Sequence, residues 1–269
     1  MATIQPYQAV PAGLLGNGTA PGRQAQGLCI GVHSPPKTGK SSLGVSGPGP
    51  CCVIDSEVAG VWTPGRKVYW DPARQTVPAW RGPDDWQICD VPVQSIDTLF
   101  AVQSVLASGH HPFNSVSVDS VPSVAHRAMV AMAARRKMER DDWGQLLRDI
   151  LQVITGFKDL LVHPVNPVWS VVYIFPTHYD FKTRKMRPYL QGQSADLVPY
   201  QFDLMGVMYV QGTHPDGQPA HHLYTGPSQQ YETGDRLWGR LPADLIIGHP
   251  GRVPGWTVQS MVEEAIRQS

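Results

Sequence analysis

The sequence predicts an α/β protein with a twisted, mostly parallel β-sheet, helices on both faces of that sheet and a β-hairpin extension near the C-terminus. Short apolar runs, such as GLCIGVH at 27–33, are typical of strands buried on both faces. Segments with helical spacing of apolar residues follow such runs along the chain, as in a parallel sheet with crossover helices. The 269 residues, 42% of them hydrophobic, are enough for one large domain.

Buried strands are predicted wherever a short apolar run is bounded by turn residues. These runs lie at 27–33, 51–55 (CCVID), 86–91, 115–119 (SVSVD) and 170–175 (SVVYIF). Residues 34–43 follow the first run as a turn that opens a helix. Residues 56–86 show no period and hold four of the eight tryptophans, so we expect an irregular connection there.

Helices are predicted where apolar residues recur at helical spacing, as Leu99, Val102 and Leu106 do in SIDTLFAVQSVLAS. These segments are 95–108, 122–137, 141–160 and 257–267. The hairpin is predicted from two strand-like runs, 202–211 and 221–225, around Pro215-Asp216-Gly217, and 179–200 is expected to be a basic, turn-rich loop. Residues 1–25 show no period and predict an extended N-terminal arm, which leaves 26–269 as a single domain.

The charge balance limits the classes of function. Lys plus Arg equals Asp plus Glu at 22 each, which excludes a protein that holds nucleic acid through its overall charge but not one with a local basic patch. No run approaches the roughly 18 apolar residues of a membrane span, and the first residues do not resemble a signal peptide. We therefore expect a cytoplasmic protein without a membrane partner, whose four cysteines are buried free thiols.

The segment after the first strand resembles the phosphate-binding pattern G-x-x-x-x-G-K-[ST]. It reads Ser34-Pro35-Pro36-Lys37-Thr38-Gly39-Lys40-Ser41, followed by Ser42. The last three positions match, whereas Ser34 replaces the first glycine, and serine adopts left-handed backbone angles less readily. In this pattern backbone N–H groups surround a phosphate, Lys40 reaches the β- and γ-phosphates, and the Ser41 hydroxyl binds Mg²⁺. The alternative is a Gly-Lys-Ser loop without a ligand.

Two acids follow other predicted strands and are candidates for the same site. Asp119 ends the run SVSVD, where a P-loop ATPase needs an acid for the Mg²⁺ shell. Glu57 follows the strand that ends at Asp55 and offers a carboxylate that could polarise the attacking water. Because ligands of open α/β sheets bind at the carboxyl ends of strands, we expect these side chains to meet the phosphate loop there. His178 follows the strand ending at Phe175 and is a candidate contact to the γ-phosphate.

The ordered set of motifs resembles the RecA-like ATPase core, and most closely the phage-encoded RecA-like ATPases associated with single-strand annealing and recombination. The motifs are SPPKTGKSS, VIDSE, VSVDS, DDWGQLLRDI, IFPTHYD, YLQGQSADLVPYQFD and GDRLWGRLP, which together span about residues 27–242. The resemblance implies a RecA-like P-loop fold that uses ATP and Mg²⁺ and acts as a homo-oligomer, either a ring or a filament.

The resemblance also implies roles for individual residues. Lys40 and Ser41 match the phosphate and Mg²⁺ positions, and Asp119 matches the acid of the second nucleotide motif. Glu57 matches the glutamate that activates water. His178 matches the sensor residue that links the γ-phosphate to the DNA-binding loop. Arg236 resembles a basic residue that reaches the ATP of a neighbouring subunit, and Gly234 departs from the pattern because a lysine is usual there.

The family binds DNA through loops, and the segment 179–187 is the best match to such a loop. Its basic side chains could neutralise phosphates while its two aromatic residues stack on unpaired bases. The basic residues are Lys182, Arg184, Lys185 and Arg187.

These features predict an ATP-dependent recombination or annealing protein that acts on single-stranded DNA, alone or with a single-strand annealing or binding protein. Two alternatives stay open. One is a nucleotide-dependent switch or scaffold of the same fold that acts on a protein partner, and the other is a structural protein with a relic phosphate loop.

Overall fold

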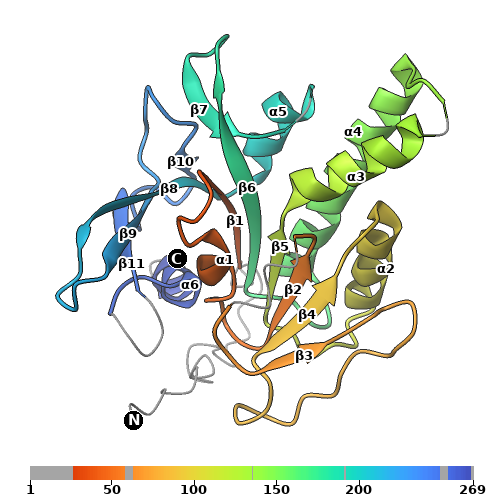
Figure 1. Ribbon diagram of the computed structural model, residues 1–269. Coiled ribbons are helices and arrows are strands. Elements are labelled where there is room, and N and C mark those ends of the chain that lie inside the picture. Colours follow the sequence, from red (N-terminus) through yellow and green to blue (C-terminus); the bar gives the residue numbers. More distant parts are fainter. Residues whose placement is uncertain (1–26, 58–62, 135, 191, 249–253, 268–269) are drawn as a thin grey trace.

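The computed structural model describes residues 27–57, 63–134, 136–190, 192–248 and 254–267 (Figure 1). The strands are β1 (Leu28–Ser34), β2 (Cys51–Asp55), β3 (Lys67–Tyr69), β4 (Ile88–Pro92), β5 (Ser115–Asp119), β6 (Ser170–Asp180), β7 (Lys185–Pro188), β8 (Leu204–Thr213), β9 (Pro219–Tyr224), β10 (Gly234–Asp235) and β11 (Asp244–Ile247). The helices are α1 (Lys40–Gly44), α2 (Ile96–Ala107), α3 (Val121–Ala133), α4 (Arg140–Lys158), α5 (Ser194–Leu197) and α6 (Val258–Arg267), with short 3₁₀ turns at Asp159–Val162 and Val198–Gln201.

One mixed sheet joins the strands in the order β11-β9-β8-β1-β6-β5-β2-β4-β3. The strands from β8 to β3 along this path are parallel, and β9 and β11 extend the sheet with antiparallel pairs. The predicted α/β fold with a C-terminal hairpin is therefore confirmed, with β8 and β9 as the hairpin. One strand, β6, lies between β1 and β5, so the segments that follow β1 and β5 emerge at the same edge.

Helices cover both faces of the sheet because alternate strand residues are apolar on each face. In β6, Val171, Tyr173 and Phe175 pack with α2, α3 and α4, whereas Val172 and Ile174 pack with α1 and α6. Figure 1 shows these two helical layers on opposite sides of the central strands. No helix in the described part of the chain is long and apolar enough to cross a membrane.

Two of the long helices, α2 and α4, begin at side chains that cap the helix N-terminus. The Ser95 hydroxyl accepts a hydrogen bond from the N–H of Thr98 at the start of α2. At the start of α4, Glu139 and Asp142 form a reciprocal capping box. These caps fix where the two long helices α2 and α4 begin.

Two predicted irregular segments contain regular structure. Within 56–86, Lys67–Tyr69 forms the edge strand β3, and Trp70 and Trp86 pack on Phe113 with ring centroids 6.2 and 5.9 Å apart. The segment 179–200 is also not a simple loop, because β6 continues to Asp180 and turns back as β7, with α5 following. The predicted arm at 1–25 lies outside the described residues.

Candidate active site

The loop between β1 and α1 has the backbone of an anion-binding turn. Lys37 and Gly39 adopt left-handed angles, with φ of 65° and 91°. Left-handed residues within a tight turn direct successive N–H groups to one concave side, where they can bind an anion. Ser34, by contrast, is the last residue of β1 and pairs with Pro176 of β6. The replacement of the first motif glycine by Ser34 therefore imposes no left-handed strain, and the strained position falls instead on Lys37.

Lys40 lies over the start of this loop. Its ammonium donates hydrogen bonds to Pro35 O at 2.8 Å, Ser34 Oγ at 3.0 Å and Ser34 O at 3.2 Å. The Ser34 hydroxyl also contacts the hydroxyl of Thr38. Burial lowers the pKa of Lys40, while the negative charges of Asp119 and Glu57 oppose that shift. The structure thus places a partly buried ammonium at the phosphate loop, close enough to the two predicted acids for their charges to act on it.

Ser41 and Asp119 meet directly. The Ser41 hydroxyl donates to Asp119 Oδ2 at 2.5 Å, although the two residues come from different segments of the chain. Burial raises the pKa of the Asp119 carboxyl to about 6; the Ser41 hydrogen bond lowers it, and the negative charges of Glu57 and Asp55 raise it further. The geometry therefore brings together the two predicted Mg²⁺ residues.

A hydroxyl and a carboxylate are oxygen donors of the kind that Mg²⁺ takes, so the pair fits this ion. Among the residues that the structure describes, no group of three His, Cys, Asp or Glu side chains gathers to hold a metal. Such a cluster is not needed for a magnesium nucleotide, because Mg²⁺ keeps waters and takes most of its other ligands from the phosphates.

Close packing of α1 on β5 makes the contact between Ser41 and Asp119 possible. A Cβ atom at Gly44 would overlap Ser117 Oγ and press on Ile174, so only glycine lets the helix approach this closely. Gly44 ends α1 one turn after Lys40 and Ser41 begin it. The absence of a side chain at position 44 thus sets the height of Ser41 above the sheet.

Glu57 lies at the neighbouring strand end, held by hydroxyl groups from the start of α3. Ser120 Oγ and Ser123 Oγ donate to Glu57 Oε1 at 2.7 and 2.6 Å. Its backbone N–H donates to Asp55 Oδ1 at 2.9 Å, and Asp55 pairs with Asp119 across β2 and β5. The carboxylate of Glu57 is therefore oriented at the same sheet edge as the phosphate loop.

Thr177, and not the predicted His178 beside it, contacts the end of β1. His178 packs against Tyr189 with ring centroids 5.5 Å apart, and its Nδ1 is buried without a hydrogen-bond partner. Thr177 Oγ1 lies 3.0 Å from Nδ1 of His33, the residue before Ser34. The alternation of side chains along β6 accounts for the difference, because neighbouring residues face opposite sides.

Arg236 follows β10, remote from the phosphate loop of its own chain. Its backbone N–H bonds to Asp203 O, and Asp203 binds the backbone of Cys29 at the amino end of β1. The guanidinium of Arg236 contacts the carbonyl of Tyr200 and lies 4.0 Å from Asp203 Oδ1. A side chain at Gly234 would meet nothing within 4 Å, so the departure from lysine there reflects no lack of space.

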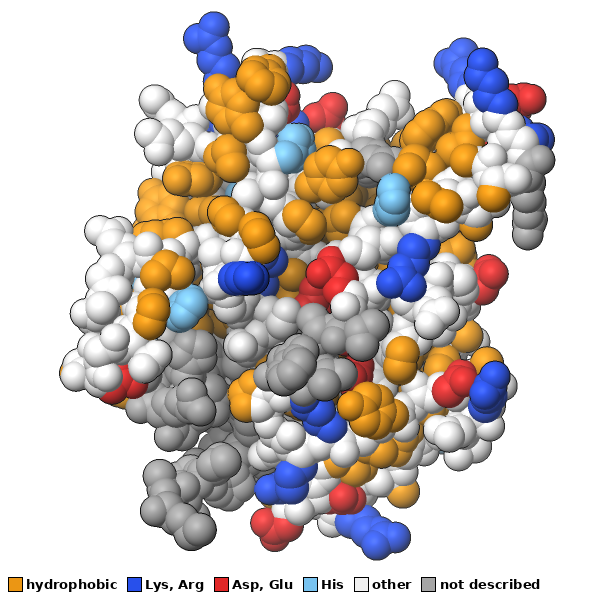
Figure 2. Space-filling view, in the orientation of Figure 1, with side chains coloured by type: hydrophobic (Ala, Val, Ile, Leu, Met, Phe, Trp, Pro, Cys, Tyr) orange, Lys and Arg blue, Asp and Glu red, His pale blue; other side chains and the backbone are white. Residues whose placement is uncertain are grey.

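The basic residues of the β6–β7 hairpin have two different environments. Lys182 and Arg184 are exposed at the tip beside Phe181, which is 86% exposed, and Lys185 is half-buried at the start of β7. Figure 2 shows Lys and Arg side chains gathered over this hairpin and over the turn between α3 and α4, with apolar side chains on the surface between them.

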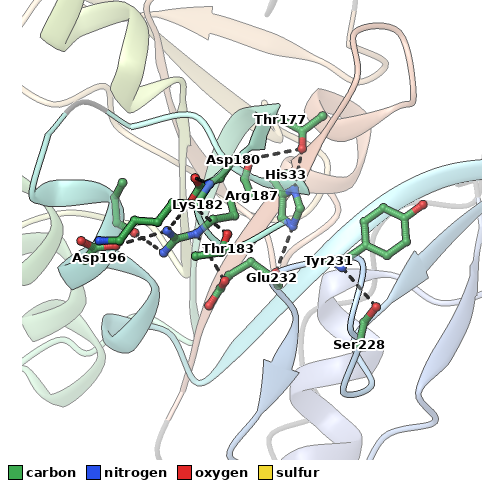
Figure 3. A network of polar contacts seen from close by, with 11 residues as sticks. His33, Thr177, Asp180, Lys182, Thr183, Arg187, Asp196, Ser228, Tyr231 and Glu232 are labelled. Atoms are coloured by element: carbon green, nitrogen blue, oxygen red, sulfur yellow. Dashed lines mark hydrogen bonds and ion pairs between the residues drawn. The ribbon is translucent and has the colours of Figure 1, made fainter. Parts of the chain in front are cut away.

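Arg187, which is also predicted to bind DNA, has a different environment from the other basic residues of the hairpin. Arg187 is only 7% exposed and forms ion pairs with Asp180 at 3.0 Å, Asp196 at 3.2 Å and Glu232 at 3.3 Å (Figure 3). These carboxylates neutralise the guanidinium and hold it at the base of the hairpin. Arg187 therefore stabilises the hairpin instead of extending its basic surface.

The structure adds two histidines that the sequence patterns did not single out for this site. His221 of β9 places Nδ1 2.8 Å from Thr38 O, and its ring lies beside Gly39. His33 is fully buried directly before the phosphate loop. The only sequence signal for His33 was a polar residue at the end of an apolar strand, and His221 had none because its partner is far away in the chain.

The comparison with protein families agrees with this geometry. A family model described as "AAA domain" matches residues 26–237. The matched range includes the phosphate loop, the strand-end acids, the β6–β7 hairpin and Arg236, and it ends before β11 and α6. A search of curated proteins finds no match to this sequence.

Proposed function

The chain belongs to the AAA domain family of P-loop NTPases, and from this we propose that it binds ATP with Mg²⁺ and hydrolyses the γ-phosphate bond. The observation that carries the proposal is the contact between Ser41 of the phosphate loop and Asp119 at the end of β5, with Lys40 and Glu57 beside it. This is the set of groups that phosphoryl transfer to water requires: donors for the phosphates, oxygen ligands and a carboxylate near the attacking water.

Each residue has a defined task in this proposal. The N–H groups of residues 35–41 bind the phosphates, and Lys40 exchanges its contacts with Ser34 and Pro35 for phosphate oxygens. Ser41 and Asp119 would hold the Mg²⁺, which would supply positive charge against the phosphate oxygens. Glu57 orients a water molecule, while Ser120 and Ser123 fix its carboxylate through Oε1.

Calorimetry in the presence of Mg²⁺ tests the binding step. Titration with ATP and with GTP is expected to give measurable heat, with ATP as the preferred nucleotide. If neither triphosphate gives heat with the folded protein, the proposal fails and the structural-protein alternative is favoured.

The proposed enzyme acts as a homo-oligomer in which Arg236 serves the neighbouring subunit. In its own chain, Arg236 lies at the level of Cys29, five residues before Ser34, or about 16 Å along a strand that rises roughly 3.3 Å per residue. This separation exceeds the reach of its side chain toward its own phosphate loop. Beside Arg236, Trp238 is 95% exposed in a left-handed conformation with φ of 54°, and Tyr200 is 72% exposed.

Exposed Trp, Tyr and Arg side chains are the types that dominate interfaces between proteins, which supports a second copy of the chain at this surface. An arginine supplied in trans raises phosphoryl-transfer rates by about 10³–10⁵-fold. The ATPase rate per subunit is therefore expected to rise with protein concentration. A rate per subunit that stays constant from dilute to concentrated protein contradicts this arrangement.

The nucleic acid on which the proposed ATPase acts is single-stranded DNA, which the β6–β7 hairpin binds. The exposed tip combines Lys182 and Arg184 with Phe181 and Tyr179, whose rings are 5.0 Å apart and nearly perpendicular. Cations that pair with phosphates and rings that stack on bases form a sequence-tolerant site for a single strand. A pocket of about 330 Å³ lies below the hairpin, lined by Glu57, His126, Pro176 and Tyr189 among others.

The biological task proposed for this DNA binding is recombination or strand annealing, alone or with a separate single-strand annealing or binding protein. The alternative, a nucleotide-dependent switch that acts on a protein partner, is supported by the exposed Trp238 and by the net charge of zero. Gel shifts with labelled oligonucleotides across a salt series separate the two functions. DNA binding that weakens as salt rises supports the first, and ATP binding without a shift supports the second.

A further inference from the structure

His33 joins three segments at the start of the phosphate loop. Its ring is completely buried, with Nδ1 3.0 Å from Thr177 Oγ1 on β6 and Nε2 3.0 Å from the carbonyl oxygen of Glu232 (Figure 3). Thr177 begins the hairpin arm of β6, and Glu232 belongs to the segment that runs beside β7. The ring therefore connects the last residues of β1 with both sides of the hairpin base.

The partners of His33 define the state of the ring. Burial lowers the pKa of His33 to about 4, so the imidazole is neutral at neutral pH. Because the carbonyl of Glu232 only accepts, Nε2 carries the hydrogen and Nδ1 is left as an acceptor. The hydrogen bond between His33 and Thr177 must then be donated by the Thr177 hydroxyl.

That hydroxyl has a second possible acceptor. Thr177 Oγ1 also lies 3.2 Å from the carbonyl oxygen of Arg187, on the opposite strand of the hairpin. A hydroxyl has one hydrogen to donate, so it can bond to His33 or to Arg187 but not fully to both. The Thr177 hydroxyl therefore has two alternative acceptors, one at the end of β1 and one on the hairpin, and a shift between them would link the two regions.

Ion pairs and hydrogen bonds hold the hairpin base together, so it can pass a change at Thr177 on to the hairpin tip. The side chain of Arg187 is fixed by Asp180 and Asp196, and the segment beside β7 is tied by hydrogen bonds between Glu232 N and Met186 O and between Met186 N and Gln230 O. The exposed tip at 181–184 follows directly after this hydrogen-bonded and ion-paired base of the hairpin.

The phosphate loop is linked to His33 by a single peptide bond. The ammonium of Lys40 bonds to Ser34 O, Ser34 Oγ and Pro35 O, and it must release some of these acceptors to bind a phosphate. Release changes the restraint on Ser34 and hence on the adjoining His33. We propose that His33 and Thr177 are positioning residues that couple nucleotide binding at the phosphate loop to the conformation of the β6–β7 hairpin tip. This inference depends on the ATP binding proposed above.

Tryptic cleavage at the tip measures the coupling, because Lys182 and Arg184 are exposed cleavage sites. The wild-type full chain is digested with and without a non-hydrolysable ATP analogue and Mg²⁺, and the cleavage rates at these two sites are compared. The nucleotide is expected to change the rate by at least about twofold, since residues that carry coupling contribute 0.5–2 kcal/mol.

Three variants test whether the Thr177 hydroxyl carries the coupling. Thr177→Val, which keeps the side-chain shape but removes the hydroxyl, is expected to bind the analogue with unchanged affinity and to lose the nucleotide effect on cleavage. Thr177→Ser keeps the hydroxyl and should retain the effect. Thr155→Val removes a hydroxyl that bonds to Leu151 within α4, remote from the hairpin, and should behave as the wild type.

The outcomes distinguish this inference from the proposed function. If Thr177→Val keeps the wild-type nucleotide effect, or if Thr177→Ser loses it, the coupling role is wrong. If the wild type binds the analogue without any change in cleavage, the inference also fails, while ATP binding stands. If the wild type binds no nucleotide, it is the proposed function that fails.

Discussion

The hydroxyl of Ser41 lies 2.5 Å from Oδ2 of Asp119, which joins the first turn of α1 to the end of β5. β6 separates β1 from β5 in the sheet, so the contact bridges over an intervening strand. It brings together a loop that can bind phosphate and an acid that can bind Mg²⁺. The following predictions concern this site, the surfaces around it and the buried histidine beside it.

Lys40→Ala is expected to lower ATP affinity by at least about tenfold, because charge-assisted hydrogen bonds to phosphate are lost at a partly buried position. Calorimetry with Mg²⁺ measures the change. Lys182→Ala, which removes an exposed ammonium from the hairpin tip, is the matched control and should bind ATP normally. Equal ATP binding by the wild type and Lys40→Ala would mean that the loop does not hold the phosphates.

Glu57→Gln is expected to leave ATP affinity nearly unchanged and to lower the hydrolysis rate by about 10²–10⁴-fold, the range of a lost general base. The amide can still accept hydrogen bonds from Ser120 and Ser123, so the local structure is preserved. Steady-state ATPase assays check the rate, with Glu263→Gln on α6 as the control. A rate within a few-fold of the wild type would exclude Glu57 from the reaction.

Mixing two inactive variants tests whether Arg236 acts on a neighbouring subunit. Arg236→Ala and Glu57→Gln are each expected to be slow alone. A mixture should recover activity, because some interfaces then combine an intact Glu57 from one chain with an intact Arg236 from the other. Absence of any recovery, with both variants still self-associating in analytical ultracentrifugation, would show that Arg236 does not act in trans.

Trp238→Ala is expected to weaken self-association without changing the fold. The side chain is 95% exposed, so its removal costs little internal packing, whereas a buried interface tryptophan contributes about 2 kcal/mol or more. Sedimentation at several concentrations measures the effect, and circular dichroism confirms that the variant is folded. Ile246→Ala is the control, because this apolar residue is 48% exposed and lies on β11.

Removal of charge from the hairpin tip is expected to weaken binding to single-stranded DNA uniformly across sequences. For the double variant Lys182→Ala/Arg184→Ala, the dependence of log affinity on log salt should become shallower by about 1–2, since each phosphate contact contributes roughly 0.7 for single strands. Arg74→Ala, an exposed arginine beside β3, serves as the control. An unchanged salt dependence in the double variant would place the DNA site elsewhere.

The stability of the protein should depend on pH through His33. Its folded-state pKa is lowered to about 4 from 6.5, so between these values the unfolded chain binds a proton that the folded chain does not. Stability therefore falls as pH decreases from about 6.5 to 4, by on the order of 3 kcal/mol from this residue alone. His33→Gln removes this contribution. The difference in stability between the wild type and this variant is therefore expected to be smaller at pH 4.5 than at pH 7. Urea unfolding at pH 7 and pH 4.5 measures the difference.

The parts of the site that depend on local sequence could be predicted from it. The phosphate loop, Asp119 and Glu57 each follow a short apolar strand, and parallel strands bring their carboxyl ends to one edge. Knowing the order of the strands was not necessary to expect that these groups meet. The structure adds the contact geometry and shows that Ser34 belongs to a strand instead of a left-handed turn.

The features that the sequence could not reveal depend on partners distant in the chain. Arg187 stands among exposed basic residues and gives no sign that its guanidinium is neutralised by three carboxylates, one of them on Glu232. The contact between His33 and Thr177 spans 144 positions in the sequence. Each of these arises from the register of strands, which no pattern within a single segment specifies.

Position 44 should be as intolerant of change as any residue that touches the nucleotide. A methyl group there would lie 2.4 Å from Ser117 Oγ and 3.0 Å from the side chain of Ile174, so we expect α1 to move away from the sheet and to carry Ser41 away from Asp119. A mutational survey scored by ATPase activity would therefore rank Gly44 with Lys40 and Asp119, although the Cβ position of Gly44 points to Ser117 and Ile174 of the sheet.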